Sequence, residues 1–272
     1  MDNIPRIIEE TGDFAVVFKP PKMHSREQGT MAKHDNGTLF GWYAEHSPPV
    51  FDIMHRLDFE TNGLALFAKN KKSFDFFKDL QDTGQFIKEY SAIVTRNDLF
   101  GTGQVGEASP GEASPGEKSL GSFPPDGFSP EGFPQAPVFK CTPSFEEPAV
   151  IESFFRPYGP GRKLVRPVTE TASKRHYKIA MDKGGLYKTE IIDINGNVFT
   201  VRIKRGFRHQ IRCHLCWIGF PLLNDPLYPQ PVHENSIAFT GKMALRAHAL
   251  FFADPASGKQ RECRISSISS LS

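Results

Sequence analysis

The segment that most constrains how this chain can fold is residues 101–139, near its middle. Eight Gly, seven Pro and five Ser account for 20 of its 39 positions, and the pentapeptide GEASP occurs there twice in tandem. Pro and Gly interrupt helices, and so few apolar side chains cannot offset the entropy lost on ordering. We therefore predict a disordered surface segment. Its composition alone leaves open whether it is an insertion in one domain or a linker between two.

The parts of the chain on either side of this segment contain many short strand patterns. Apolar runs at 14–18, 64–68 and 90–94 predict buried strands before it. Two alternating runs after it flank Asn195-Gly196, a dipeptide typical of hairpin turns. Further strands are expected in the remaining apolar runs, at 177–180, 245–252 and 263–265.

Two segments have the spacing of amphipathic helices. The first is predicted to be capped by Ser73 and to end at Gly84. The second spans 208–218, with Ile211, Leu215 and Ile218 on one side. Because strands outnumber helices and hairpins favour antiparallel pairing, we predict a mixed α+β domain built on a large sheet.

Positive charge is concentrated outside the central segment. The whole chain has 33 basic and 31 acidic residues, and removing 101–139 leaves 32 basic against 26 acidic. The basic residues form three clusters: Arg202, Lys204, Arg205, Arg208 and Arg212; Arg162, Lys163 and Arg166; and Lys174, Arg175 and Lys178. Such clusters are typical of polyanion-binding surfaces, but ordinary solvated faces have the same composition.

No apolar run approaches the roughly 20 residues that a membrane-spanning helix requires. The amino terminus, MDNIPRIIEE, has acidic residues where a secretory signal has a basic start and an apolar stretch. We therefore expect a cytoplasmic protein with no membrane partner.

Two groups of residues have the chemistry of an active site. Asp58 follows Arg56 at the start of a buried strand, where a nearby cation keeps a carboxylate ionised for attack or proton transfer. The alternative is an aspartate that only caps a turn. His209 and Arg212 share one face of the predicted helix, and Arg212 can bind a carboxylate or phosphate with two hydrogen bonds. The alternative there is an ordinary basic helix surface.

A third group, Cys213 and Cys216 with His209, suggests zinc. Zinc usually takes about four ligands from two pairs, and no second pair stands out because Cys141 and Cys263 are isolated. Small buried core cysteines are the favoured interpretation. The sequence thus predicts no metal site.

Residues 55–69, HRLDFETNGLALFAK, closely resemble HRLDxxTSGLLLFAK, the signature of the RluA family of RNA pseudouridine synthases. Segments at 88–94, 209–228 and 245–250 resemble further motifs of that family in the same order. The resemblance implies a single pseudouridine synthase catalytic domain over 1–272, around a mixed, mostly antiparallel sheet. It also implies that 101–139 is an insertion within this domain.

The resemblance implies an enzyme that isomerises uridine to pseudouridine in structured RNA, without a metal or cofactor. Asp58 matches the essential aspartate, which attacks the nucleoside or assists deprotonation at the sugar. Tyr90 matches the ring that stacks on the flipped uracil and can act as a base at C5. Arg212 matches the partner of the aspartate, and Ile211 an apolar pocket residue. Arg56 matches the arginine that enters the RNA stack.

Residues at and just before 209–212 complete the expected substrate site. His209 and Gln210 match the family's HQIR, whereas Gly206-Phe207-Arg208 departs from its usual G-R-[TS] because an arginine has moved by one position or been replaced. Arg208, like His209 and Gln210, is expected to contact the substrate. About a dozen residues precede the first predicted strand, and we expect no S4 domain. We expect a monomer that binds a stem-loop of ribosomal or transfer RNA. Two other classes stay open: a non-catalytic RNA-binding protein on the same scaffold, and a zinc-dependent hydrolase.

Overall fold

The computed structural model describes residues 3–26, 37–95, 148–170, 174–228 and 241–268. The predicted segment 101–139 lies outside the described residues. The strands are β1 (Arg6–Glu10), β2 (Phe14–Lys19), β3 (Asp52–Ile53), β4 (Asn62–Ala68), β5 (Ile87–Ile93), β6 (Ala149–Tyr158), β7 (Leu164–Val168), β8 (Tyr187–Asn195), β9 (Val198–Ile203), β10 (Leu245–Ala253) and β11 (Gln260–Arg264). The helices are α1 (Leu39–His46), α2 (Lys71–Asp82), the 3-10 turn η1 (Pro160–Arg162), α3 (Lys174–Gly184) and α4 (Gln210–Trp217).

All the described strands belong to one 11-stranded sheet. Its order is β1-β2-β4-β10-β5-β9-β8-β6-β7, with β11 beside β10 and β3 beside β4. Strands β4 and β10 run parallel, and the other described pairs are antiparallel. The predicted α+β class with a mixed, mostly antiparallel sheet is therefore confirmed.

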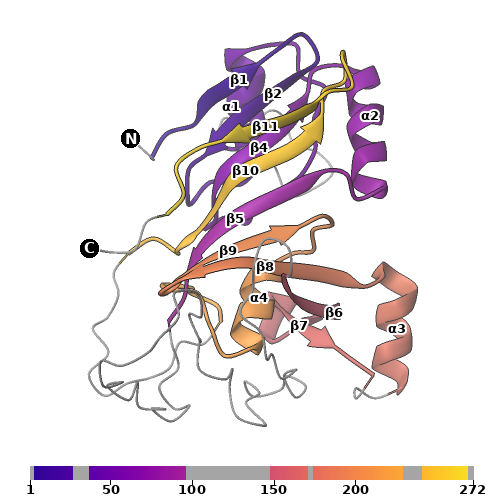
Figure 1. Ribbon diagram of the computed structural model, residues 1–272, viewed down its shortest axis with the longest axis vertical. Coiled ribbons are helices and arrows are strands. Elements are labelled where there is room, and N and C mark those ends of the chain that lie inside the picture. Colours follow the sequence, from indigo (N-terminus) through magenta and orange to yellow (C-terminus); the bar gives the residue numbers. More distant parts are fainter. Residues whose placement is uncertain (1–2, 27–36, 96–147, 171–173, 229–240, 269–272) are drawn as a thin grey trace, which may run out of the picture.

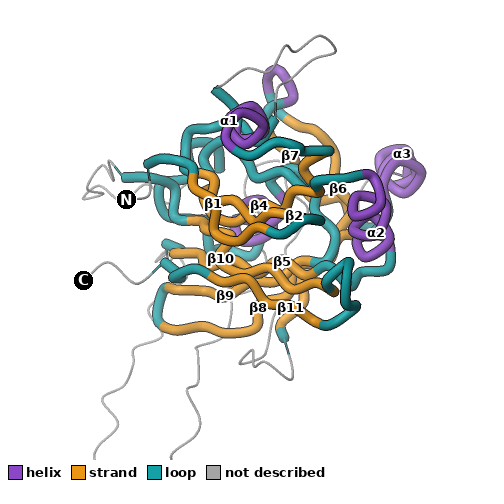
Figure 2. Tube along the Cα trace, turned by 90° about the horizontal axis from the view of Figure 1, so that it is seen from above, coloured by secondary structure: helices purple, strands orange, loops and turns teal. Residues whose placement is uncertain are grey.

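Strand β5 joins two groups of elements that flank it (Figure 1). The N-terminal strands, together with β10 and β11 from the C-terminal part of the chain, lie on one side of β5 with α1 and α2. Strands β6 to β9 lie on the other side with α3 and α4. Figure 2 shows the strands stacked across the middle of the molecule, with α1, α2 and α3 at its periphery. The cross-strand pairing of β5 with both β10 and β9 makes the sheet continuous.

Strands β2 and β4 are buried along their whole length, as their unbroken apolar runs predict. Side chains on one face pack with Phe77 and Leu80 of α2, and those on the other face pack with Leu39 and Tyr43 of α1. Gly63 of β4 lies so close to β10 that a Cβ would be 2.2 Å from the carbonyl oxygen of Ala247. Glycine is therefore required there, immediately after the loop that carries Asp58.

The second core forms around α4. All eight residues of this helix are buried, and Ile211, Leu215 and Trp217 pack with Tyr90 of β5 and Val201 of β9. The predicted helix is confirmed, but it begins at Gln210 rather than at residue 208. An ordinary solvated basic surface is excluded for the helix itself because all eight of its residues are buried, whereas Arg208 before it is exposed.

The strand expected at 177–180 is wrong, because these residues belong to α3. Tyr177 contacts Phe154 of β6 edge-on at 5.4 Å, and Ala180 is buried one helical turn later. Ile179, which a strand would place on the same face as Tyr177, is 41% exposed. Four residues are too few to separate a period of 2 from one of 3.6, so the sequence pattern was ambiguous.

The predicted helix cap and the predicted hairpin turn are each displaced by one to three residues. Helix α2 is capped by Asn70, whose side chain accepts a hydrogen bond from the Ser73 backbone at 2.9 Å, so Ser73 is not the cap. Such a cap is worth about 1 kcal/mol. The hairpin between β8 and β9 is confirmed, but Asn195 pairs with Val198 and the loop residues are Gly196 and Asn197.

Among the described residues, no helix is both long and apolar enough to cross a membrane.

Candidate active site

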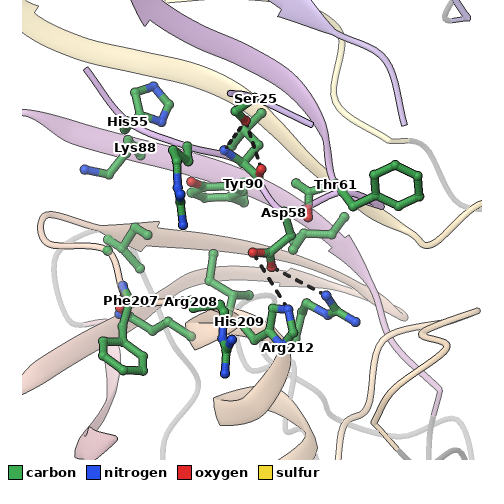
Figure 3. Close-up of a pocket in the computed structure, with 18 of the residues that line it drawn as sticks. Ser25, His55, Asp58, Thr61, Lys88, Tyr90, Phe207, Arg208, His209 and Arg212 are labelled. Carbon is green, nitrogen blue, oxygen red and sulfur yellow. Dashed lines mark hydrogen bonds and ion pairs between the residues drawn. The ribbon is translucent and has the colours of Figure 1, made fainter. Parts of the chain in front are cut away.

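A pocket of about 1190 Å³ lies where the loop before β4, strand β5 and the start of α4 meet (Figure 3). It brings together every predicted site residue: Arg56, Asp58, Tyr90, Arg208, His209, Gln210, Ile211 and Arg212. Its other basic lining residues are Arg26, Lys88, Arg162, Lys163, Lys204 and Arg205. Two of the three basic clusters predicted from the sequence thus contribute to one cavity.

Hydrogen bonds to the backbone of Leu57 and Asp58 fix the loop that carries the Asp58 side chain. The Ser25 hydroxyl accepts a hydrogen bond from the Leu57 N–H and donates one to the Leu57 carbonyl, both at 2.9 Å. The Asp58 carbonyl accepts from the Thr61 N–H at 3.1 Å, which closes the turn into β4. The Asp58 carboxylate is left 23% exposed, and it points toward His209 and Arg212 (Figure 3).

Arg212 links Asp58 to a second carboxylate. Its Nη1 lies 3.5 Å from Asp58 Oδ2, and its Nε and Nη2 donate to both oxygens of Asp225 at 2.8 and 2.7 Å. Burial opposes the charge of Arg212, but the hydrogen bonds and charge of Asp225, followed by the charge of Asp58, raise the pKa of the guanidinium. Arg212 is therefore a fixed cation in front of Asp58.

Asp225 is the site residue that the sequence prediction missed. Its side chain is fully buried, and its Oδ1 also accepts the backbone N–H groups of Leu227 and Tyr228 at 2.9 and 3.2 Å. The only available signal was its place in the matched segment 225–228. A carboxylate beside proline, 13 positions after Arg212, gives no local pattern that pairs the two.

Tyr90 lies in the middle of β5 and is buried, with its ring beside Asp58 in the pocket (Figure 3). Burial, and to a lesser degree the negative charge of Asp58, raise the pKa of its phenol. The phenol is therefore protonated at neutral pH. The exposed part of the ring is a flat apolar surface next to a carboxylate.

His209 caps α4 in a left-handed conformation with φ of 57° and faces the pocket. Its Nε2 is 4.0 Å from Asp58 Oδ1, and its Nδ1 is 3.4 Å from the Tyr228 hydroxyl. Burial lowers the pKa of His209 to about 4, so the ring is neutral near pH 7. Ile211 is buried and gives the pocket an apolar wall.

Gln210 and Arg208 use their polar groups on the protein itself. The Gln210 side chain accepts from the Phe207 N–H and donates to the Lys188 carbonyl, both at 2.9 Å. Nη2 of Arg208 donates to the carbonyls of Arg162 and Leu164. These contacts hold neighbouring backbone segments around the pocket. A direct substrate contact by either residue stays a prediction, as it does for Arg56, which is exposed at the rim.

The two cysteines considered for zinc lie in the core, whereas His209 lines the pocket. Cys213 and Cys216 are buried beside Phe155 and Tyr187, and the Cys213 thiol donates to the Val165 carbonyl at 3.5 Å. Burial raises the pKa of Cys216 to about 12. Within the described ranges, no three His, Cys, Asp or Glu side chains converge as a metal site would require.

A buried histidine behind the pocket predicts acid sensitivity. The His214 ring lies between the hydroxyls of Ser153 and Thr189, at 2.9 and 2.8 Å, and burial lowers its pKa to about 3. In the unfolded chain this histidine has an ordinary pKa of about 6.5. Between this pH and about 3, the unfolded chain binds a proton that the folded chain does not bind. Stability is therefore retained above about pH 6.5 and lost as the pH falls toward 3.

We expect His214→Gln to flatten the pH dependence of the unfolding free energy by up to about 1.4 kcal/mol per pH unit between about pH 6 and 4. Urea denaturation at several pH values measures it. The reference is the wild-type protein, denatured at the same pH values. An unchanged slope in His214→Gln would contradict this account of His214.

Comparisons with known proteins identify the family of this chain. A family model described as RNA pseudouridylate synthase matches residues 13–217. The chain therefore belongs to the RNA pseudouridylate synthase family, and the resemblance to the RluA family found in its motifs is confirmed.

The curated relatives are distant and longer than this chain. "Ribosomal large subunit pseudouridine synthase D" of Haemophilus ducreyi is 25% identical over 276 residues, covering 96% of this chain and 67% of the relative. "RNA pseudouridine synthase 7" of Arabidopsis thaliana is 25% identical over 240 residues, covering 87% and 48%. An uncharacterized protein of Caenorhabditis elegans is 27% identical over 233 residues, and this chain spans 39% of its length.

Two solved structures share the fold. The human RNA pseudouridylate synthase domain containing 1 superposes with a TM-score of 0.59 at 17% identity, covering 98% of this chain and 84% of that one. The human RNA pseudouridylate synthase domain containing 4 gives a TM-score of 0.53 at 14% identity, covering 96% and 88%. At these identities the likeness concerns the fold alone.

Proposed function

We propose that this chain isomerises uridine to pseudouridine in structured RNA, with Asp58 as the catalytic carboxylate. The observation that carries the proposal is the placement of the Asp58 carboxylate in a basic pocket, 3.5 Å from the fixed guanidinium of Arg212. The Asp58 side chain thus lies beside a buried cation while remaining partly exposed to a substrate.

The reaction breaks the N1–C1′ bond of uridine, turns the freed uracil and joins C5 to C1′, while the hydrogen of C5 leaves as a proton and N1 takes up a proton. No oxidant or reductant is consumed, so the balance needs no redox cofactor. In this scheme Asp58 attacks the nucleoside or assists deprotonation at the sugar. The neighbouring Arg212 offsets the changes of charge on that carboxylate as the reaction proceeds.

Tyr90 and Ile211 supply the surfaces that hold the uracil. The protonated phenol of Tyr90 supports a stacking role in the free enzyme, because a phenolate base would require a lowered pKa rather than a raised one. Ile211 offers an apolar wall on the opposite element, α4. A cavity of about 1190 Å³ is somewhat larger than the usual ligand site of about 300–1,000 Å³, so a nucleotide extruded from its stack has room.

The basic lining of the pocket supports RNA as the polyanion. The lysine and arginine side chains that line the pocket with Asp58 are suited to the phosphates of an extruded nucleotide and its neighbours. Several relatives carry names that refer to the large ribosomal subunit. Ribosomal RNA is therefore the first substrate to examine, with transfer RNA as the second.

The proposal is tested by mapping pseudouridine in total RNA from cells that lack this gene, before and after incubation with the purified full chain. We expect at least one uridine to be converted. A protein that binds this RNA without converting any uridine would favour the non-catalytic RNA-binding alternative and contradict the proposal.

RNA affinity is expected to fall as salt rises, because phosphate contacts release counterions. Replacing the exposed rim residue Arg56 by Gln removes one such contact, and we expect the slope of log K against log salt to decrease in magnitude by about 0.7–0.9. Lys259, exposed outside the pocket, supplies the matched control. Binding by Arg56→Gln with the wild-type slope would place Arg56 outside the phosphate interface.

A further inference from the structure

Two aromatic rings lie exposed at the rim of the pocket, beside the catalytic carboxylate. Phe59, the residue after Asp58, is 41% exposed, and its ring centroid is 4.7 Å from that of the exposed His24. Single exposed apolar side chains are common and need no explanation. Among the exposed large apolar side chains of the described residues, however, Phe59 and Leu227 are the two that line this pocket.

The backbone beneath these rings is fixed. The Phe59 carbonyl accepts hydrogen bonds from the Lys22 N–H at 2.7 Å and from the buried Lys19 Nζ at 3.3 Å. The His24 carbonyl accepts from the Leu39 N–H at 2.9 Å, at the start of α1. Rings carried on fixed backbone lose little conformational entropy when a ligand stacks on them. The two rings are tilted by 40° to each other, so a flat ligand can stack on the exposed face of one of them.

The charges around the ring pair fit a nucleic acid strand. Arg26 and Arg56 are exposed and line the same rim, and Asp58 lies between Arg56 and Phe59 in the sequence. Arg26 already pairs with Asp52 and lies over the Phe40 ring, so Arg56 is the guanidinium that can bind a phosphate next to a base on the rings. Aromatic side chains bind bases of unpaired RNA by stacking, with little dependence on the base.

We propose that His24 and Phe59 form a stacking platform for an unpaired nucleobase next to the target uridine; this inference rests on the proposed function. Extruding a uridine removes the stacking partner of its neighbour in the strand, at a cost of a few kcal/mol. A base that moves onto the platform regains a stacking surface. The platform thereby stabilises the extruded state without contacting the reacting atoms, so its residues position the RNA and do not take part in the chemistry.

Binding of an oligouridylate of about 12 nucleotides, followed by fluorescence anisotropy, tests the platform in the full chain. Phe59→Leu keeps an apolar side chain but removes the aromatic face, and we expect affinity to fall about 10-fold. Phe59→Trp is expected to restore it. Phe51→Leu is the matched control, because Phe51 is similarly exposed, at 43%, outside the pocket.

The salt dependence of binding separates stacking from charge. Phe59→Leu is expected to keep the wild-type slope of log K against log salt, because no phosphate contact is removed. A smaller slope in Phe59→Leu would assign its effect to displaced phosphate contacts and overturn the stacking role.

Photocrosslinking locates the base directly. An oligouridylate that carries 5-iodouridine is irradiated with the protein, which is then digested with trypsin and examined by mass spectrometry. We expect the crosslink in the peptide 23–26, which carries His24, or in 57–69, which carries Phe59. Crosslinks confined to other peptides would overturn the platform.

The stacking platform and the proposed isomerase function are refuted by different results. Wild-type protein that converts uridine, together with Phe59→Leu that binds as tightly as the wild type, would overturn the platform and leave the proposed function intact. Wild-type protein that neither binds oligouridylate nor converts uridine would overturn both.

Discussion

Replacing Asp58 by Asn is expected to lower the rate of pseudouridine formation by at least about 10³-fold, because a neutral amide can neither attack the nucleoside nor accept a proton from it. The amide has nearly the shape of the carboxylate, and the side chain is 23% exposed, so the fold is expected to persist. Chromatography of nucleosides from digested RNA measures the rate. RNA binding by Asp58→Asn is expected to remain close to that of the wild type.

The control for this substitution is Asp75→Asn, which removes an exposed carboxylate on α2 outside the pocket. We expect it to leave the rate unchanged. Substantial pseudouridine formation by Asp58→Asn would remove the catalytic role of Asp58.

Replacing Asp225 by Asn is expected to destabilise the protein by about 3–5 kcal/mol, because Arg212 would keep its buried charge without the carboxylate that now accepts two of its hydrogen bonds. Asp58 cannot replace Asp225, since it is 3.5 Å from Arg212 and partly exposed. Urea denaturation measures the loss. A change below about 1 kcal/mol, as for an exposed pair, would contradict this interpretation.

A double variant separates stability from function at this pair. Removing both charges of a buried ion pair leaves no uncompensated charge behind. We therefore expect Arg212→Met with Asp225→Asn, which keeps an acceptor for the N–H groups of Leu227 and Tyr228, to recover much of the stability lost in Asp225→Asn alone. The same variant is expected to remain inactive, because Asp58 would have no cation beside it. Recovery of activity would show that Arg212 acts only in folding.

Patterns confined to neighbouring residues predicted much of this fold. Strands β2 and β4 could be recognised because both of their faces are buried, which produces unbroken apolar runs. The hairpin of β8 and β9 could be recognised from alternation on both sides of a glycine turn. Motif resemblance then identified the residues that the structure brings together in the pocket.

Features that depend on distant parts of the chain could not be predicted in this way. The pairing of Arg212 with Asp225 depends on how the segment after α4 returns, and Ser25 reaches the Asp58 loop across 32 residues. The helical state of 177–180 is decided by packing of Tyr177 against β6, which no local pattern encodes. The exposure of Phe59 likewise became visible only in the folded chain.

Release of tritium from RNA labelled at C5 of its uridines tests the central claim most directly, because joining C5 to C1′ expels that hydrogen into water. Unmodified ribosomal RNA transcribed with the labelled nucleotide, incubated with the purified full chain, is predicted to release tritium in proportion to the pseudouridine formed. Asp58→Asn is predicted to release none above background. No release by the wild type from ribosomal, transfer or total RNA would contradict the assignment of this pocket to uridine isomerisation.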